Sequence, residues 1–283
     1  MPDHSKQTQI SEPEKAQFQV HLDKPYIADD YKGSGKLKGR TALITGGDSG
    51  IGRAVALHYA REGADIAIVY FKSDDDARIT ADLVENEGRE CLLFRGDISN
   101  EAFCHKTVDE THEKFGRLDI LVNNAGTHED APEVADITSD QLKRTFEVNI
   151  FSFFYLTQAA LKYLKEGSVV INTASITAYR GSGHLLDYSA SKGAIVTFTR
   201  SLSQNLAERK IRVNGVAPGP VWTPLVVYSF DVERLDKFGK DTPMGRAGYP
   251  YELGPAYVFL AAEDSSYITG QMIHVNGGDV ING

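Results

Sequence analysis

The sequence predicts an α/β protein with a doubly wound parallel sheet of seven strands and helices on both faces. Three observations support this fold class. Short, apolar, β-branched segments alternate with segments of helical spacing over most of the chain, which is the pattern of a parallel sheet. A glycine-rich turn follows the first apolar segment, as is typical of the first strand-to-helix connection in doubly wound folds. No internal repeat or linker interrupts the alternation, so we expect a single domain.

The first predicted strand, residues 41–45, is short and apolar, which suits a strand buried on both faces of a parallel sheet. A helix is predicted after it at 51–62, because apolar residues recur there at helical spacing, and Gly63 ends this helix. The same alternation continues to the end of the chain. Further strands are predicted at 66–70, 91–94, 120–122, 168–172, 211–216 and 272–275, and further helices at 75–86, 101–115, 139–165, 188–209 and 252–262.

Residues 1–38 form an N-terminal extension that precedes this pattern, and the α/β domain is assigned to residues 39–283. The extension is polar and lacks a sustained apolar period, which is typical of a disordered tail. The alternative is a partly ordered segment that lies along the surface of the domain or of a neighbouring subunit. Its apolar side chains favour that alternative: Phe18, Val20, Tyr26, Ile27 and Tyr31. The sequence leaves both alternatives open.

Charge and cysteine content exclude several classes of function. The formal net charge is -9, from 30 basic and 39 acidic residues, which argues against binding to nucleic acid or to an anionic membrane. No apolar run approaches the roughly 20 residues of a transmembrane helix, and no secretory signal is evident. Cys91 and Cys104 lack the spacing of metal ligands, so we expect no metal site and a reduced, cytoplasmic protein.

The glycine-rich turn has the pattern G-x-x-x-G-x-G at Gly46, Gly50 and Gly52. Glycines allow a tight turn, a close approach of backbone N–H groups to a pyrophosphate, and close packing of helix on strand. The helix N-terminus then faces the phosphates. A turn without any ligand is the alternative, and a P-loop is excluded because no Gly-Lys-Ser/Thr follows. Contacts to a dinucleotide are predicted for Gly46, Asp48, Ser49, Gly50, Ile51 and Gly52.

The end of the second strand bears on which nicotinamide dinucleotide would bind. An acidic residue there would bind the ribose 2′-hydroxyl and favour NAD. Tyr70 occupies that place, and Asp65 lies at the wrong end of the strand. Lys72 and Ser73 follow, and both side chains could contact a 2′-phosphate. The sequence therefore favours NADP over NAD, with a solvated surface lysine as the alternative for Lys72.

Polar residues follow the fourth and fifth strands and begin the next long helix. Asn123–Gly126 follows the fourth strand, Ser175 follows the fifth, and Tyr188 and Lys192 lie on one helix face because they are four residues apart. All reach the same edge of the sheet, where ligands of doubly wound folds bind. A nearby ammonium is expected to lower the pKa of a tyrosine from about 10, making it a better acid–base catalyst. An ordinary pair of helix side chains is the alternative.

Together these motifs resemble the short-chain dehydrogenase/reductase family, single-domain enzymes with a Rossmann-type fold. The resemblance covers about residues 37–283. The N-terminal extension of the chain is similar to that of bacterial stress- and sporulation-associated aldehyde, alcohol or sugar reductases. The family resemblance rests on Thr45-Gly46-x-x-x-Gly50-x-Gly52, Asn123-Asn124-Ala125-Gly126, Asn149, Ser175, Tyr188-x-x-x-Lys192 and Pro218-Gly219-Pro220-Val221-x-Thr223.

The resemblance implies a role for each of these residues. Tyr188 would be the acid/base, Ser175 would bind the substrate oxygen, and Lys192 would bind the nicotinamide ribose and tune Tyr188. Asn149 would hold a water molecule in a proton relay. Asp97 would contact the adenine. Further contacts to the cofactor are implied for Ile98, Asn123, Ala125, Gly126, Pro218, Gly219, Val221 and Thr223, and relatives commonly form homotetramers.

The resemblance also implies a mobile substrate lid at about 224–250. Apolar and aromatic residues would form its pocket wall, and His184 and Leu185 are further candidates for substrate contact because they lie near Tyr188. The predicted function is hydride transfer between NADP(H) or NAD(H) and a carbonyl/alcohol substrate such as an aldehyde, ketone or sugar. A non-catalytic dinucleotide-binding sensor is the main alternative, and dehydration or epimerisation on the same scaffold is another.

Overall fold

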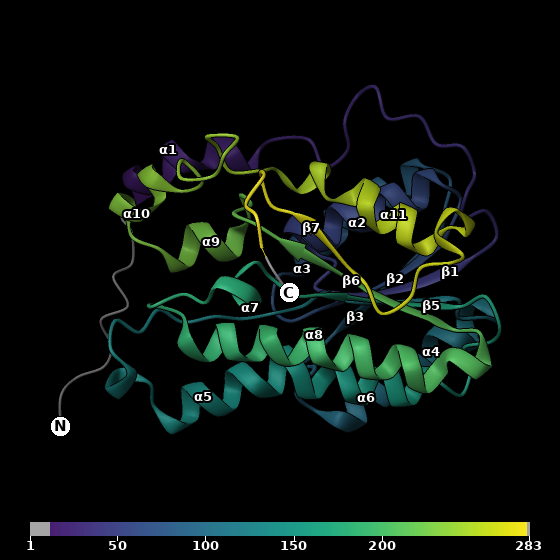
Figure 1. Ribbon diagram of the computed structural model, residues 1–283. Coiled ribbons are helices and arrows are strands. Elements are labelled where there is room, and N and C mark those ends of the chain that lie inside the picture. The colour runs from purple at the N-terminus through teal and green to yellow at the C-terminus, as the bar shows by residue number, and fades with distance from the viewer. Residues whose placement is uncertain (1–11, 282–283) are drawn as a thin grey trace.

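The structure is a computed structural model that describes residues 12–281, with side chains from residue 17 onward. Its strands form one parallel sheet in the order β3-β2-β1-β4-β5-β6-β7, with helices on both faces (Figure 1). The predicted fold class is confirmed. The strands are β1 (Thr41–Thr45), β2 (Asp65–Tyr70), β3 (Cys91–Arg95), β4 (Ile120–Asn123), β5 (Val169–Thr173), β6 (Arg212–Pro218) and β7 (Met272–Val275).

Two helical layers enclose the sheet. The layer below it in Figure 1 holds α4 (Glu101–Phe115), α5 (Ser139–Phe146), α6 (Ser152–Ala160) and α8 (Leu186–Leu206). The opposite layer holds α2 (Gly50–Arg61), α3 (Asp74–Asn86) and α11 (Gly254–Ala261). Three short helices lie at the carboxyl edge of the sheet: α7 (Thr177–Arg180), α9 (Pro224–Ser229) and α10 (Val232–Lys237).

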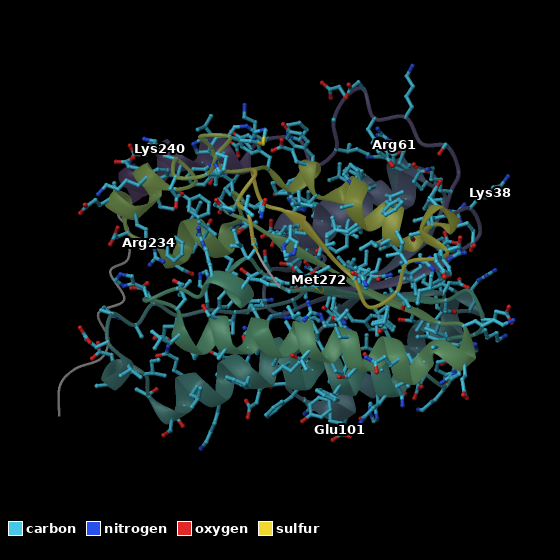
Figure 2. All side chains as sticks on the ribbon, in the orientation of Figure 1. Lys38, Arg61, Glu101, Arg234, Lys240 and Met272 are labelled. Carbon is cyan, nitrogen blue, oxygen red and sulfur yellow. The ribbon has the colours of Figure 1, made fainter. Side chains whose placement is uncertain are left out.

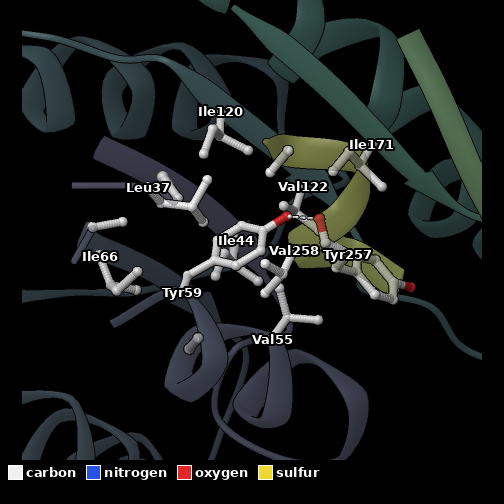
Figure 3. Close-up of a cluster of buried hydrophobic side chains, with 14 of the residues drawn as sticks. Leu37, Ile44, Val55, Tyr59, Ile66, Ile120, Val122, Ile171, Tyr257 and Val258 are labelled. Atoms are coloured by element: carbon white, nitrogen blue, oxygen red, sulfur yellow. Dashed lines mark hydrogen bonds between the residues drawn. The ribbon is translucent and has the colours of Figure 1, made fainter. Parts of the chain in front are cut away.

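Strand β1 lies in the middle of the core, with side chains buried on both faces. Ile44 packs into the cluster formed with α2 and α11, whereas Leu43 packs into the cluster on the opposite face. Figure 3 shows the first cluster, in which the Tyr59 hydroxyl donates to the backbone carbonyl of Tyr257 at 3.1 Å. Burial on both faces explains why this strand reads as a continuous apolar run.

Strands β1 and β4 are neighbours although two strands separate them in sequence. Ile44 of β1 pairs with Ile68 of β2 on one side and with Val122 of β4 on the other. The chain therefore reverses its winding direction between β1 and β4. In open α/β sheets the crevice outside the carboxyl ends of such strands is where ligands bind.

The helix predicted at 139–165 is not continuous. The structure divides it into α5, a π-helical turn at Glu147–Phe151, and α6, which ends at Ala160. Asn149 lies in the π-helical turn, where its side chain bonds to the backbone of Thr127. Such a turn carries an extra residue per helical turn and is frequent at functional sites. Apolar spacing alone does not reveal it, because the residues on either side keep a helical period.

Part of the N-terminal extension is helical. Helix α1 (Glu12–Leu22) lies beside α9 and α10 in Figure 1. Phe18 is 5% exposed and Ile27 is 8% exposed, so both side chains are buried against the rest of the chain. Residues 1–11 of the predicted extension lie outside the described residues. Of the helices in the described part of the chain, none combines the length and apolar character needed to cross a bilayer.

Candidate active site

A cleft of about 1220 Å³ opens at the carboxyl ends of the strands. This exceeds the usual range of about 300–1,000 Å³ for a small-molecule pocket, so a dinucleotide and a second molecule fit together. Most of the residues predicted to bind cofactor or substrate line this cleft. They are Gly46, Asp48, Ser49, Gly50, Ile51, Tyr70, Lys72, Ser73, Asp97, Ile98, Ala125, Gly126, Ser175, Tyr188, Lys192, Pro218, Gly219, Val221 and Thr223.

The glycine-rich turn brings the N-terminus of α2 to one wall of the cleft. Gly46 and Gly50 have φ values of +62° and +51°, which side chains other than glycine rarely adopt. A Cβ on Gly52 would lie 1.9 Å from the carbonyl oxygen of Gly46, so only glycine permits this packing of helix on turn. The free N–H groups at the start of α2 thus face the cleft, where a pyrophosphate would be stabilised.

Tyr188 lies near the start of α8, which is fixed by the carboxylate of Asp187. That carboxylate accepts hydrogen bonds from the hydroxyl of Thr145 at 2.7 Å and from the backbone N–H of Tyr188 at 2.9 Å. Asp187 and Thr145 are both buried. The bond to Thr145 joins α8 to α5. It therefore holds the first turn of α8, and with it the phenol ring, in one position.

Ser175 is oriented as a hydrogen-bond donor toward Tyr188. The backbone N–H and the hydroxyl of Thr177 both donate to its Oγ atom at 3.1 Å. Its own hydrogen is then free to donate to the phenol oxygen of Tyr188, with which it is hydrogen-bonded. Ser175 and Tyr188 thus form a donor pair in the cleft, suited to hold one oxygen atom of a substrate.

Burial dominates the pKa values of Tyr188 and Lys192. Loss of solvent raises the pKa of Tyr188 to about 12, although the bond from Ser175 opposes this. Burial lowers the pKa of Lys192 to about 7. The expectation that the lysine lowers the tyrosine pKa is therefore wrong for this state. The Lys192 Nζ atom donates to the backbone carbonyl of Thr173 at 2.9 Å and lies 5.5 Å from the Tyr188 ring centroid.

Asn149 connects helix α8 to the loop after β4. Its amide oxygen accepts from the Thr127 N–H at 2.8 Å, and its Nδ2 donates to the Thr127 carbonyl at 2.9 Å and to Ser191 Oγ at 3.0 Å. A Cβ on Gly126 would lie 3.4 Å from both Asn149 Oδ1 and Lys192 Nζ. Gly126 therefore lies next to both of these polar atoms.

The opposite end of the cleft is lined by residues that follow β2 and β3. The Tyr70 hydroxyl donates to Asp74 at 2.8 Å, and Ser73 Oγ donates to Asp76 at 2.6 Å. The Asp97 carboxylate accepts from Arg144 at 2.8 Å. Burial tends to raise the Asp97 pKa, but hydrogen bonds from the Ser99 N–H and from Arg144 lower it below its usual value. Asp97 therefore stays ionised and fixed at the predicted adenine end.

Several predicted residues do not line the cleft. Gly52 packs against Gly46, and the side chain of Asn123 is buried, donating to Asn172 at 3.0 Å; both positions indicate packing rather than contact with cofactor. Asn149 does not itself line the cleft, but it lies directly behind two cleft residues, Gly126 and Thr127. His184 is exposed, and it does not contribute to the cleft wall.

His128 is a cleft residue that sequence reasoning missed. Its ring lies edge-on to Tyr188 and stacks on Phe230, each with a centroid distance of 5.3 Å. Its Nε2 atom is shielded and has no hydrogen-bond partner among the described residues. Burial and the neighbouring cations Arg234 and Lys192 lower its pKa to about 4. The available signal was its position two residues after Gly126, at the same edge of the sheet.

The segment predicted as a lid contains α9 and α10 and forms the outer wall of the cleft. Arg234 of α10, labelled in Figure 2, forms an ion pair with Asp130 in the loop after β4. The same guanidinium lies 3.7 Å from the centroid of the Phe230 ring. These contacts hold the outer wall to the opposite rim of the cleft. Among the described residues, no group of three or more His, Cys, Asp or Glu side chains could hold a metal ion.

Comparisons with known proteins agree with this geometry. A family described as enoyl-(acyl carrier protein) reductase matches residues 46–279. The chain is 56% identical over 256 residues to general stress protein 39 of Bacillus subtilis, covering 90% of each chain. It is 48% identical over 284 residues to NADPH-dependent aldehyde reductase 1, chloroplastic, of Arabidopsis thaliana, covering 98% of each.

Solved structures agree as well. The fold matches a short chain dehydrogenase from Burkholderia cenocepacia in complex with NADP, with a TM-score of 0.82 and 33% identity, over 86% of this chain and 98% of that one. The resemblance inferred from the motifs is thus confirmed by overall sequence similarity and by fold. The chain belongs to the short-chain dehydrogenase/reductase family and is an NAD(P)-dependent oxidoreductase.

Proposed function

We propose that this protein reduces the carbonyl group of an aldehyde, ketone or sugar-like molecule with NADPH, and that Tyr188 is the proton donor. The observation that carries this proposal is the donor pair of Ser175 and Tyr188, which shares one cleft with the N-terminus of α2. The Arabidopsis relative is named as an NADPH-dependent aldehyde reductase, which supports the same substrate class here.

The residues of the chain account for the acid–base part of the reaction. When bound, the nicotinamide supplies the hydride. Ser175 donates a hydrogen bond to the substrate oxygen, and Tyr188 transfers its phenolic proton to that oxygen as charge develops on it. Lys192, with its pKa lowered to about 7 by burial, can return a proton toward Tyr188. In the reverse direction Tyr188 accepts the proton of an alcohol.

The ribose end of the cleft favours NADP over NAD. Lys72 lines the cleft, and within residues 17–281, whose side chains are described, it forms no ion pair. The neighbouring carboxylates are already bonded, Asp74 to Arg95 at 2.7 Å and Asp76 to Arg53 at 3.0 Å. The amine of Lys72 lies 5.0 Å from the centroid of the Phe71 ring, and a cation that is not paired to a carboxylate suits a 2′-phosphate better than a 2′-hydroxyl.

A panel assay tests the proposed reaction. Oxidation of NADPH is followed by absorbance with a series of aldehydes, ketones and sugars, using wild type and Tyr188→Phe. We expect turnover with at least one class and a loss of roughly a thousandfold or more in Tyr188→Phe, with NADPH binding retained. Full activity in Tyr188→Phe, or binding of NADPH without turnover of any carbonyl in the panel, contradicts the proposal.

We also propose a homotetramer, as the family resemblance implies. Support comes from apolar side chains that remain exposed on one helical face: Phe151 and Phe154 are each 44% exposed. Phe154 lies against Phe198 of α8 with a centroid distance of 4.4 Å, so the patch extends over two helices. Contiguous exposed aromatics mark interaction surfaces. A native mass measurement tests this, and a monomer at micromolar concentration contradicts it.

A further inference from the structure

We infer that helix α1 braces the lid over the catalytic tyrosine, and that Phe18 and His21 are positioning residues for the substrate site. This inference rests on the proposed function, since it assigns the lid segment (residues 224–250) to substrate binding. It goes beyond that function by giving the N-terminal extension a part in the reaction.

His21 contacts both ends of the lid segment. Its ring stacks on Trp222, just before the segment, with a centroid distance of 4.2 Å and an interplanar angle of 3°. Its Nδ1 atom is hydrogen-bonded to the hydroxyl of Tyr249, near the end of the segment, at 3.2 Å. One side chain of α1 therefore ties together the two points at which the lid leaves the domain and returns to it.

Phe18 adds an apolar anchor one turn earlier in the helix. Its ring lies 6.2 Å from that of Trp222, and it is buried in a cluster with Val227 and Leu235 of the lid. Phe18 is 5% exposed, whereas Val20 on the other face of the same helix is 54% exposed. Within residues 17–22 of α1, Phe18 therefore faces the lid and Val20 faces solvent.

Aromatic contacts continue from α1 through the lid to the catalytic residue. The ring of Trp222 lies 5.0 Å from Phe238, which lies 6.2 Å from Phe230. Phe230 stacks on His128 at 5.3 Å, and His128 lies 5.3 Å from Tyr188. These spacings are typical of favourable ring pairs. Displacing α1 removes the support at the outer end of this packed series, and the wall beside Tyr188 loosens as a result.

The residues between α1 and β1 hold the brace in place along α2. Tyr26 lies 4.7 Å from the guanidinium of Arg53 and is hydrogen-bonded to the backbone of Gly50 in the glycine-rich turn. The Tyr31 hydroxyl donates to Glu62 at 2.6 Å, and Arg61, labelled in Figure 2, donates to the Tyr31 carbonyl at 3.1 Å. With this connection fixed, α1 docks without a large loss of chain entropy.

The first test measures amide hydrogen exchange of the lid in the full-length protein. Phe18→Ala and His21→Ala are compared with Val20→Ala, which removes a side chain from the exposed face of the same helix. We expect exchange in residues 224–250 to rise about tenfold or more in the first two variants, with exchange in the strands and in Val20→Ala unchanged. Trp222 is the only tryptophan in the chain, so its emission should also shift to longer wavelength in those two variants.

The second test separates positioning from general support. With the best carbonyl of the substrate panel, Phe18→Ala and His21→Ala should raise KM about fivefold or more and change kcat by less than about twofold. His21→Phe keeps a ring over Trp222 and should restore most of the wild-type KM. The inference is overturned if amide exchange of the lid in Phe18→Ala and His21→Ala stays at the wild-type rate. It is also overturned if exchange in the strands rises as much as exchange in the lid. Exchange and emission need no turnover, so they decide this inference even where the proposed reaction fails.

Discussion

The side-chain amine of Lys192 donates a hydrogen bond to the backbone carbonyl of Thr173, at the end of strand β5, at 2.9 Å. The lysine is thereby held by the sheet and not by the phenol of Tyr188, whose ring centroid lies 5.5 Å away. Burial lowers the pKa of this amine to about 7. Lys192 therefore changes charge near neutral pH, whereas the hydroxyl of Tyr188 stays protonated.

Replacing Lys192 by Met should stabilise the protein and abolish efficient turnover. The pKa of Lys192 in the folded chain, about 7, lies below the unfolded value of 10.5. Burial of this amine therefore lowers the free energy of unfolding, and the effect is at its full size below pH 7. This cost decreases as pH rises from 7 to 10.5. We expect Lys192→Met to raise the free energy of unfolding by about 1–4 kcal/mol at pH 7, and the difference to shrink at pH 9.5. Denaturant titrations at both pH values measure this, and a less stable variant at pH 7 contradicts it.

The fold, and the grouping of Ser175, Tyr188 and Lys192 in one cleft, were predictable because their signals are local. A buried parallel strand such as 41–45 is apolar on both faces, and Tyr188 and Lys192 lie on one helix face through their spacing alone. The pKa values of that pair were not predictable, since they depend on burial by the rest of the chain. The same holds for His128 and for the docking of Phe18 on Trp222, whose partners are distant in sequence. The π-helical turn at Asn149 also depends on a distant contact, with Thr127.

Removing the hydroxyl of Ser175 should weaken catalysis without unfolding the protein. Ser175→Ala deletes the donor to the substrate oxygen, and we expect kcat/KM to fall about 100-fold or more. Ser182→Ala is the matched control, because Ser182 also lines the cleft whereas the serine hydrogen-bonded to Tyr188 is Ser175. Steady-state kinetics with NADPH compares the two. Equal effects of both substitutions would assign Ser175 to packing only.

Reversing the charge of Lys72 should change the choice of cofactor. Lys72→Glu places a carboxylate in the wall where a 2′-phosphate would bind, and we expect the Kd for NADPH to rise about tenfold or more while the Kd for NADH changes little. Lys240→Glu makes the same change in net charge at an exposed residue outside the cleft. Fluorescence titrations of both variants with both dinucleotides test this. A similar loss for NADPH and NADH would place Lys72 away from the 2′-position.

His128 should make the stability of the protein sensitive to acid. Burial, together with Arg234 and Lys192, lowers its pKa to about 4 from the ordinary value of 6.5. Between pH 6.5 and 4 the unfolded chain binds a proton at this side chain that the folded chain does not, so this histidine costs stability progressively as pH falls through that window.

His128→Phe keeps a ring against Tyr188 and Phe230 and removes the unpartnered Nε2 atom. We expect the variant to lose about 1–2 kcal/mol less stability than wild type between pH 7 and pH 5. Urea unfolding at the two pH values measures the difference. Parallel pH dependence in both proteins would show that His128 titrates normally, and would require a solvated ring beside Tyr188.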